Sequence, residues 1–496
     1  MGIVIRQSFW TSLMMYAGVV IGYINTLVLL PKYLEFDQIG LIRLIQSNAT
    51  MMIPVAVLGM SGSVVKYFPS FRNNKDTRNS IITLHLSILL ISNLLIASLS
   101  YFFIDQIALF FEEKSSAYID YIFITILILS FQSFFEYLFS ISRSNLNIIF
   151  PSFLKEVVLR LASLVLVLLY GLEKIEFGQF IVFLCGFYML NSVLFISYLI
   201  VKKHFALNFH FQSIEKKLFK ELINYSGYTL LTSIGISIIT NISYLMTSKF
   251  LGLEANGIFT TCMFIGIIIE MPKRAMSFIV GPLVSDTFKR NDINQIEHIY
   301  QRASLNLGII GMLITIGVIT NLDDFFLMVS KGEQIALGYW VIIGVGCAKL
   351  ISMIFGPSGE LLLFSQLKNF MLYLMMLSAF LIVFLNWLLI PSLGLNGAAI
   401  AFFLTTFSDQ LFRFILIKTR LKIRLFVKQH ILLILIGIST AFIISSIPFY
   451  INPLLNILIR SIITSVIFLG LIYIFKVSEE INFTINKTLA RIFKNA

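Results

Sequence analysis

The sequence contains one ten-residue stretch in two versions: Pro31-Lys32-Tyr33-Leu34-Glu35-Phe36-Asp37-Gln38-Ile39-Gly40 and Ser248-Lys249-Phe250-Leu251-Gly252-Leu253-Glu254-Ala255-Asn256-Gly257. A lysine, an aromatic residue, a leucine, an acid and a glycine match between them, all at the same spacing of 217 residues (249 − 32). Each copy lies between two apolar segments. A repeat at a fixed spacing indicates a duplicated structural unit, and it has to be identified before the fold is assigned.

Two further matches lie at almost the same spacing. Arg72-Asn73-Asn74 precedes Lys289-Arg290-Asn291 by 217 residues, and the turn at Gly178 precedes the turn at Gly397 by 219 residues. Three matches at nearly the same spacing are stronger evidence of a duplication than one short match would be. The sequence therefore predicts that most of the chain consists of two related halves.

The composition is that of a membrane protein. Of the 496 residues, 58% are hydrophobic and only 12% are charged, and the mean hydropathy is +0.91. Apolar runs of about 20 residues recur, and at 1.5 Å per residue a helix of that length crosses roughly 30 Å of hydrocarbon. Backbone polar groups inside a bilayer need internal partners, which helices provide. We predict an all-α integral membrane protein with about 14 transmembrane helices.

The predicted spans are Ser8–Leu30, Ile39–Val65, Ile81–Ile104, Tyr118–Phe139, Ile149–Tyr170, Phe177–Val201, Ser226–Ser248, Gly257–Leu283, Ala303–Leu322, Ile335–Phe355, Phe370–Ile390, Gly394–Ile417, Ile431–Ile447 and Leu455–Phe475.

The distribution of basic residues predicts the orientation of these spans. With the N-terminus in the cytoplasm, 30 of the 37 lysines and arginines lie on the cytoplasmic side and 7 on the outer side. Because basic residues are retained on the cytoplasmic side, this places both termini in the cytoplasm and favours an even number of spans. The net charge of +12 is carried by short loops and not by a basic face with interleaved aromatic residues, which argues against a nucleic-acid-binding protein.

The repeat divides the chain into four parts: residues 1–201, the N-terminal six-helix lobe; 202–225, a cytoplasmic linker with an amphipathic helix; 226–417, the C-terminal six-helix lobe; and 418–496, two extra helices and a cytoplasmic tail. Since six spans return the chain to the same side, both lobes cross the membrane in the same direction. Parallel repeats of this kind are related by an axis along the membrane normal, and we expect a central cleft between them.

No enzyme or metal site is indicated. Cys185, Cys262 and Cys347 lie inside apolar runs without CxxC spacing, which is typical of small packing residues. The five histidines lack metal-ligand spacing, and the adjacent aspartates Asp323 and Asp324 lie in a short outer loop without metal-binding neighbours. We therefore expect neither catalysis nor a cofactor.

Four stretches are distinctive: Leu58-Gly59-Met60-Ser61-Gly62 leading into Lys66-Tyr67-Phe68-Pro69, Lys249–Phe259, Pro282–Asp286 and Ile390–Ala401. With the predicted pair of six-helix lobes and two extra helices, they resemble the polysaccharide flippases, which handle lipid-linked oligosaccharides such as O-antigen precursors. This family belongs to the superfamily that also holds the multidrug and toxic compound extrusion transporters and the lipid II flippases. The resemblance covers nearly the whole chain. Its motifs are structural, so they do not specify a substrate.

The resemblance implies a multi-pass protein of the bacterial inner membrane that flips undecaprenyl-diphosphate-linked oligosaccharide to the outer leaflet by alternating access, for O-antigen (lipopolysaccharide) or capsule biosynthesis. The implied partners are this substrate, the lipid bilayer, H⁺ or Na⁺ if transport is coupled, and other polysaccharide-assembly membrane proteins. An ion-coupled multidrug or small-solute exporter of the same superfamily is the alternative, since a fold does not decide its substrate. A scaffold without transport would not need charges inside its spans.

Four cations are candidates for binding the diphosphate, because a charge at the centre of a span costs roughly 2.5–3.5 kcal/mol on insertion scales and needs a reason to be there. Lys349 either binds substrate or extends to the inner headgroups. Arg43, followed by Gln46, either faces a polar cleft or anchors its helix at the outer interface. Lys249, at the outer mouth, either receives the diphosphate after flipping or anchors its helix at the interface. For Arg160, an intramembrane ion pair is the alternative.

One acid and two amides complete the candidate site. Glu270 lies near the middle of its span and next to a proline, where it would bind a coupling proton or sodium ion or else pair with Lys273 or Arg274. Asn25 and Asn241 lie in the first helix of each half, among tyrosines whose rings and hydroxyls suit sugars. Tyrosine is also common in interface belts, which leaves the structural alternative open.

Overall fold

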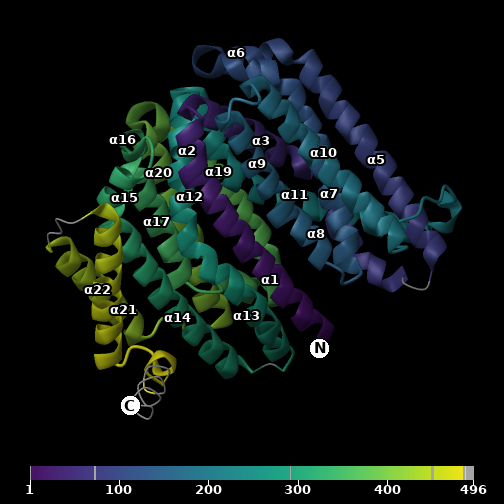
Figure 1. Cartoon of the computed structure of the whole chain (residues 1–496). Helices are drawn as coiled ribbons and strands as arrows, with labels where there is room; N and C mark the ends of the chain where they lie inside the picture. Colours follow the sequence, from purple (N-terminus) through teal and green to yellow (C-terminus); the bar gives the residue numbers. More distant parts are fainter. Residues whose placement is uncertain (1, 72–73, 291, 448–451, 484–485, 487–496) are drawn as a thin grey trace. The chain divides into compact units, whose positions relative to one another are not determined.

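The computed structural model describes residues 2–71, 74–290, 292–447, 452–483 and 486. Every regular element among these residues is helical (Figure 1). Twelve of the described helices are long and apolar enough to cross a membrane, and a bent pair, Tyr339–Ile354 with Ser358–Phe364, makes a thirteenth if it is counted as one span. The predicted all-α membrane fold is confirmed, and the predicted number of about 14 spans is close.

One predicted span, Ile149–Tyr170, is helical along its length and carries three charged residues. It consists of α8 (Ile149–Phe153), the π-helix η4 (Leu154–Val158) and α9 (Leu159–Gly171). Its charged residues Lys155, Glu156 and Arg160 lower its hydropathy. A second π-helix, η1 (Ile24–Leu29), follows α1. Short π-helical turns inside α-helices are frequent at functional sites.

The helices form two compact units, which are described separately. Unit 1 contains residues 1–261 and 379–394, and unit 2 contains residues 262–378 and 395–496. The predicted boundaries at 201, 225 and 417 follow the duplication of the sequence and stay a prediction. The match between residues 72–74 and 289–291 lies partly outside the described residues, because 72, 73 and 291 are not among them.

Unit 1 contains α1 (Gly2–Tyr23), η1, α2 (Leu30–Tyr33), α3 (Phe36–Val57), α4 (Met60–Tyr67), η2 (Phe68–Phe71), α5 (Lys75–Phe102), α6 (Ile104–Ser115), η3 (Ser116–Tyr121), α7 (Ile122–Ser144), α8, η4, α9, α10 (Phe177–Val201), η5 (Phe211–Ser213), α11 (Lys216–Leu251) and parts of α12 (Leu253–Ile267) and α19 (Lys368–Leu393). Capping boxes begin α3, with Glu35 and Gln38, and α10, with Glu176 and Gln179. Buried apolar side chains of α4, α5, α7 and α10 form one hydrophobic core of this unit.

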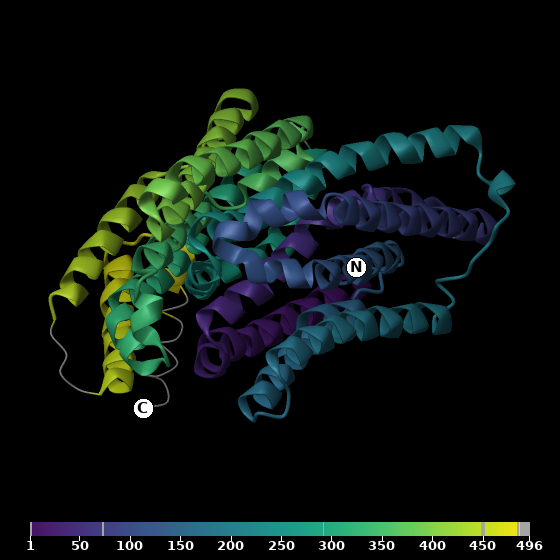
Figure 2. The same cartoon turned by 90° about the horizontal axis from the view of Figure 1, so that it is seen from above.

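The segment that joins α10 to α11 packs against α5 and can be followed in Figure 2. Ser80 Oγ donates a hydrogen bond to the His210 carbonyl oxygen at 3.0 Å, and the Asn208 backbone N–H donates to Thr83 Oγ1 at 2.8 Å. α11 begins at Lys216 and continues without a break to Leu251. The amphipathic helix predicted in the linker therefore forms the first turns of a much longer helix.

Unit 2 contains the remainder of α12, η6 (Ile268–Glu270), α13 (Met271–Lys289), α14 (Ile293–Thr320), α15 (Leu322–Met328), α16 (Gly332–Ala336), α17 (Tyr339–Ile354), α18 (Ser358–Phe364), the first part of α19, α20 (Leu395–Leu416), η7 (Ile417–Leu421), α21 (Lys428–Ser445) and α22 (Pro453–Ile474). The C-terminal helices α21 and α22 pack against each other and against α14. Leu433, Ile436 and Phe468 are buried in this contact.

The two copies of the repeated stretch contact each other inside unit 1. A Cβ added to Gly40 would collide with the carbonyl oxygen of Leu253, and one added to Gly257 would collide with that of Phe36. Asn256 Nδ2 donates a hydrogen bond to the Gly40 carbonyl oxygen at 2.9 Å. Gly40 and Gly257 are equivalent positions of the repeat, as are Phe36 and Leu253. The contact is therefore reciprocal.

The helices that carry these glycines run in the same direction. α11 is antiparallel to α3, because Ser237 Oγ donates to the Thr50 carbonyl oxygen at 3.2 Å while the Tyr244 ring lies over Arg43. α12 then folds back along α11, where the ring centroids of Tyr244 and Phe259 are 5.4 Å apart. α12 consequently runs parallel to α3, as expected for repeats related by an axis along the helices and not by an inverted arrangement.

Candidate functional site

Arg43 of α3 is held by an aromatic ring. Its guanidinium carbon is 3.9 Å from the centroid of the Tyr244 ring of α11. Among the described residues no acidic side chain pairs with Arg43, and its Nε is buried without a hydrogen-bond partner. A cation stacked on a ring keeps its charge available for an anion, and such contacts contribute about 0.5–2 kcal/mol.

Polar side chains of α3, α7 and α10 form a network that reaches Arg43 through Tyr188. Gln46 Nε2 donates to the Tyr188 hydroxyl at 3.4 Å, and Thr50 Oγ1 donates to Gln132 Oε1 at 3.4 Å. Tyr188 also hydrogen-bonds Gln132 and lies within electrostatic range of Arg43. We call these five residues the Arg43 cluster. Three of them, Thr50, Gln132 and Tyr188, line a cavity of about 130 Å³.

An ion pair lies on the wall of the same cavity. Lys155 of η4 pairs with Glu136 of α7, and both side chains line the cavity. Asn191 of α10 also lines it, and its buried Oδ1 has no hydrogen-bond partner among the described residues. Phenol, amide and charged groups that converge on one small space suit a hydroxylated ligand, which offers both donors and acceptors.

Three other predicted residues of unit 1 form contacts that involve no member of the Arg43 cluster. Arg160 Nη2 pairs with Glu156 Oε2 at 3.1 Å, four residues earlier in the chain. Asn25 Nδ2, in the π-helix η1, donates to Ser163 Oγ of α9 at 3.0 Å. Asn241 Nδ2 donates at 3.0 Å to a backbone carbonyl of its own helix. Each has a structural role in these contacts, and their roles toward a substrate stay predictions.

Lys249 lies at the end of α11, close to α6. Its Nζ is 3.5 Å from the centroid of the Phe110 ring and 5.7 Å from that of Phe250. Its repeat equivalent, Lys32, lies over Tyr33 at 5.1 Å. Among the described residues neither lysine forms an ion pair. The equivalent positions thus share an aromatic contact as well as a charge.

In unit 2, the predicted substrate cation and the predicted coupling acid are partners. Lys349 Nζ of α17 is 2.7 Å from Glu270 Oε2 of η6, and the two side chains are only 16% and 18% exposed. Ser352 Oγ lies 3.5 Å from the other oxygen of Glu270. The Phe402 ring lies 5.3 Å from Lys349 Nζ. The charge of Lys349 is therefore neutralised inside its span.

A second lysine lies beside this pair. Lys273 Nζ donates to both the carbonyl oxygen and Oγ of Ser352 at 2.7 Å. Glu360 and Arg413 lie within electrostatic range of Lys273, and Arg413 Nε pairs with Asp409 Oδ2 at 2.8 Å. We call Glu270, Lys273, Lys349 and Ser352 the Lys349 cluster.

The packing of parallel helices explains the Lys349 cluster. Glu270 contacts Lys349, and Lys273 contacts Ser352; in both pairs the two residues are 79 positions apart in the sequence. At the same separation, a Cβ on Gly266 would meet the Val345 side chain, so the two segments approach closely there. A constant separation means that α12, η6 and the start of α13 run alongside α17 in one register.

Sequence analysis missed Gln132, Glu136, Tyr188 and Ser352. Glu136 gave a usable signal, because it is an acid inside an apolar span and Gln132 lies four residues before it, on the same helical face. Tyr188 and Ser352 gave none, since both residue types are common in membrane helices for other reasons.

The three cysteines are free thiols: Cys185 and Cys262 are buried and Cys347 is partly buried. Within the described part of the chain, no three His, Cys, Asp or Glu side chains gather as a metal site would require. Cys262 Sγ lies 3.6 Å from the Ile335 carbonyl oxygen, a packing contact inside unit 2.

Solved transporter structures share this fold. The lipid II flippase MurJ in an inward closed conformation aligns with 94% of this chain and 98% of its own, with a TM-score of 0.76 and 16% identity. An inward-facing multidrug resistance MATE family transporter of the MOP superfamily aligns with 85% of this chain and 98% of its own, at a TM-score of 0.65 and 14% identity. A MOP superfamily transporter from Pyrococcus furiosus aligns with 84% of this chain and 95% of its own, at a TM-score of 0.58 and 12% identity. At these identities the likeness shows the fold alone.

No curated protein sequence matches the chain significantly. The family described as "Polysaccharide biosynthesis protein" matches residues 4–288, more than half of the chain. The matched range contains the Arg43 cluster, the cavity beside it and both copies of the repeated stretch. The resemblance to the polysaccharide flippase family is thereby confirmed. The chain belongs to the polysaccharide biosynthesis protein family and has the fold of the flippases and exporters of the MOP superfamily.

Proposed function

We propose that the protein is a flippase, and not an enzyme, that moves undecaprenyl-diphosphate-linked oligosaccharide from the cytoplasmic to the outer leaflet of the bacterial inner membrane. The product would serve the biosynthesis of a surface polysaccharide such as O-antigen or capsule. The observation that carries the proposal is Arg43, a cation within a membrane span that stacks on Tyr244 and is not neutralised by an acid among the described residues. Membership in a polysaccharide biosynthesis family supports it.

The Arg43 cluster offers the groups that such a substrate requires. A diphosphate needs a cation with free N–H donors, and the buried Nε of Arg43 has no hydrogen-bond partner. Sugars need side chains that donate and accept, together with an aromatic face, and Gln46, Gln132 and Tyr188 supply these. In this proposal Arg43 contacts the diphosphate and the cavity at Tyr188 contacts the first sugar. Lys249, Lys349, Arg160, Asn25 and Asn241 stay predicted substrate contacts.

Coupling to an ion is a separate proposal, and it concerns the Lys349 cluster. Glu270 is a carboxylate inside a span with Lys349 at 2.7 Å and Lys273 close by. Protonation of Glu270 would release Lys349, and deprotonation would restore the pair. A change of charge pairing of this kind is a way for a proton to alter the packing of two helices during alternating access.

The test is deletion of the gene, followed by analysis of surface polysaccharide and lipid-linked oligosaccharide. We expect surface polysaccharide to be lost and undecaprenyl-diphosphate-linked oligosaccharide to accumulate on the cytoplasmic leaflet. Complementation with the wild-type gene and with Lys32→Gln as a control should restore the surface polysaccharide, whereas Arg43→Gln should not. Normal polysaccharide in the deletion strain would contradict the proposal.

An ion-coupled multidrug or small-solute exporter is the second candidate. The buried Glu270 favours it, because exporters of organic cations require intramembrane acids. The same deletion strain separates the two functions. Increased sensitivity to cationic drugs with unchanged surface polysaccharide would favour the exporter.

A further inference from the structure

A second cavity in unit 1 is larger and apolar. It has a volume of about 450 Å³, within the range of roughly 300–1,000 Å³ typical of small-molecule sites. Side chains of α3, α5, α6, η3, α7 and α11 line it, among them Met52, Ile96, Phe103 and Leu129. All of these helices belong to candidate membrane spans, with α6, η3 and α7 together in Ile104–Ser144. An apolar space of this size among membrane spans suits a hydrocarbon chain.

An unpaired lysine lies against one aromatic side chain of the cavity wall. Phe110 is part of the cavity wall, and Lys249 Nζ lies 3.5 Å from the centroid of its ring. Ser115 Oγ donates to the Ser248 carbonyl oxygen at 2.7 Å, which fastens the end of α6 to the end of α11. Lys249 forms no ion pair or hydrogen bond among the described residues. Its charge is therefore available beside the apolar wall.

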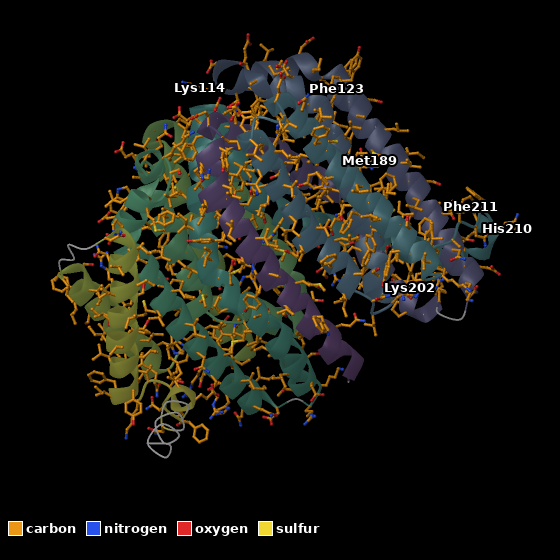
Figure 3. All side chains as sticks on the ribbon, viewed as in Figure 1. Lys114, Phe123, Met189, Lys202, His210 and Phe211 are labelled. Atoms are coloured by element: carbon orange, nitrogen blue, oxygen red, sulfur yellow. The ribbon has the colours of Figure 1, made fainter. Side chains whose placement is uncertain are left out.

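The lysine lies at the level of a helix end. α11 ends at Leu251, two residues beyond Lys249. Figure 3 shows Lys114, near the end of α6, at one end of unit 1 and Lys202, after α10, at the other. Gly252 lies next to Lys114, since an added Cβ would be 3.1 Å from the Lys114 carbonyl oxygen. A lysine at the end of membrane spans lies where lipid headgroups are found.

We propose that this cavity binds a hydrocarbon chain of an anionic phospholipid whose phosphate contacts Lys249. Charge complementarity decides the occupant. A phosphodiester such as phosphatidylglycerol carries one negative charge, which one unpaired lysine matches. A diphosphate carries more negative charge than this lysine neutralises, and the ammonium group of a zwitterionic lipid opposes binding to a cation. The site shares no residue with the Arg43 cluster, and with a phospholipid bound there Lys249 would no longer be a predicted contact of the transported substrate.

The test is native mass spectrometry of the purified full-length protein in detergent, titrated separately with dioleoylphosphatidylglycerol, dioleoylphosphatidylcholine and undecaprenyl diphosphate. We expect one phosphatidylglycerol to bind at least fivefold more tightly than phosphatidylcholine. Lys249→Gln should abolish this preference, and Lys249→Arg should keep it. Lys32→Gln is the matched control, because it removes the equivalent lysine of the first repeat, and it should bind as the wild type does.

A second pair of variants tests the cavity itself. Ser100 lies on the cavity wall, and Ser100→Trp should reduce phosphatidylglycerol binding at least fivefold by filling the space. Ser197→Trp places the same side chain on an exposed face of α10 and should leave binding unchanged. Equal thermal unfolding temperatures of both variants exclude misfolding as the cause.

Two results would overturn the proposal. One is equal binding of phosphatidylglycerol and phosphatidylcholine by the wild type. The other is tighter binding of undecaprenyl diphosphate than of phosphatidylglycerol with sensitivity to Ser100→Trp, which would make the cavity a substrate site.

Discussion

Arg43 of unit 1 and Lys349 of unit 2 are both cations inside membrane spans, but their charges are satisfied in different ways. In unit 1, Arg43 stacks on the ring of Tyr244 and has no acid beside it among the described residues. In unit 2, Lys349 pairs with Glu270, and Lys273 donates both to the hydroxyl and to the carbonyl oxygen of Ser352. The charges of Lys349 and Glu270 thus compensate each other, whereas no acid among the described residues compensates the charge of Arg43.

This difference separates two kinds of intramembrane charge. An ion pair offsets part of the cost of burying its two partners, and removing one partner leaves an uncompensated buried charge. A lone cation is costly in a membrane, and it is retained where a ligand or a pathway requires it. We therefore expect substitutions in the Lys349 cluster to act first on stability and substitutions in the Arg43 cluster to act first on transport.

The largest effect is expected for Glu270→Ala. It leaves Lys349 without its anion in a poorly hydrated place, and losing one partner of a buried pair costs about 3–5 kcal/mol. The thermal unfolding temperature of the detergent-purified protein measures this loss. Glu270→Gln combined with Lys349→Met removes both charges and should recover most of the stability. Equal instability of the single and double variants would show that the pair does not contribute as described.

Arg43→Gln is expected to reduce flipping at least tenfold with little change in unfolding temperature. The reason is that Arg43 has no acidic partner whose charge would be left uncompensated. Surface polysaccharide in the complemented deletion strain measures flipping, and Arg43→Lys should keep part of it because the charge remains. Wild-type polysaccharide with Arg43→Gln would remove Arg43 from the substrate path.

Tyr244→Leu should lower flipping a few-fold by removing the ring that holds Arg43, since a cation–π contact is worth about 0.5–2 kcal/mol. Tyr244→Phe keeps the ring and serves as the control. The same polysaccharide assay applies. Equal effects of the leucine and phenylalanine variants would show that the hydroxyl matters and the ring does not.

The smallest effect is expected for Arg160→Ala. Its ion pair with Glu156 is four residues apart on one helix and a quarter to a third exposed, and such pairs contribute about 0.3–0.5 kcal/mol. We expect flipping to fall less than threefold and the unfolding temperature to change slightly. A complete loss of surface polysaccharide would instead support the predicted contact of Arg160 with the substrate.

The helical membrane fold and the repeat could be predicted from the sequence, because both depend on features that are local or periodic along the chain. Apolar runs of sufficient length specify the spans, and the matched stretches at Lys32 and Lys249 specify the duplication. Ile149–Tyr170 was predicted as a span despite its charges, of which Lys155 and Arg160 find partners on α7 and within the span itself.

The pairing of the intramembrane charges could not be predicted in the same way. Periodicity shows which residues share a face of one helix, but not which helices lie side by side. Glu270 had nearby cations at Lys273 and Arg274 in the sequence, yet its shortest ion pair is with Lys349, 79 residues away. Similarly, the cavity beside Arg43 joins Thr50, Gln132 and Tyr188 from three helices.

At the crossing of α3 and α12, backbone touches backbone at Gly40 and Gly257. A larger residue at either position would collide with a backbone carbonyl group, and a change of side-chain rotamer cannot remove that collision. Gly40 meets Leu253, and its repeat equivalent Gly257 meets Phe36, which is the repeat equivalent of Leu253. Identical subunits related by a two-fold axis make reciprocal contacts of this isologous kind. At this crossing the repeated stretch is therefore self-complementary, and contacts of this kind are what two copies of a half-length protein would need to pair.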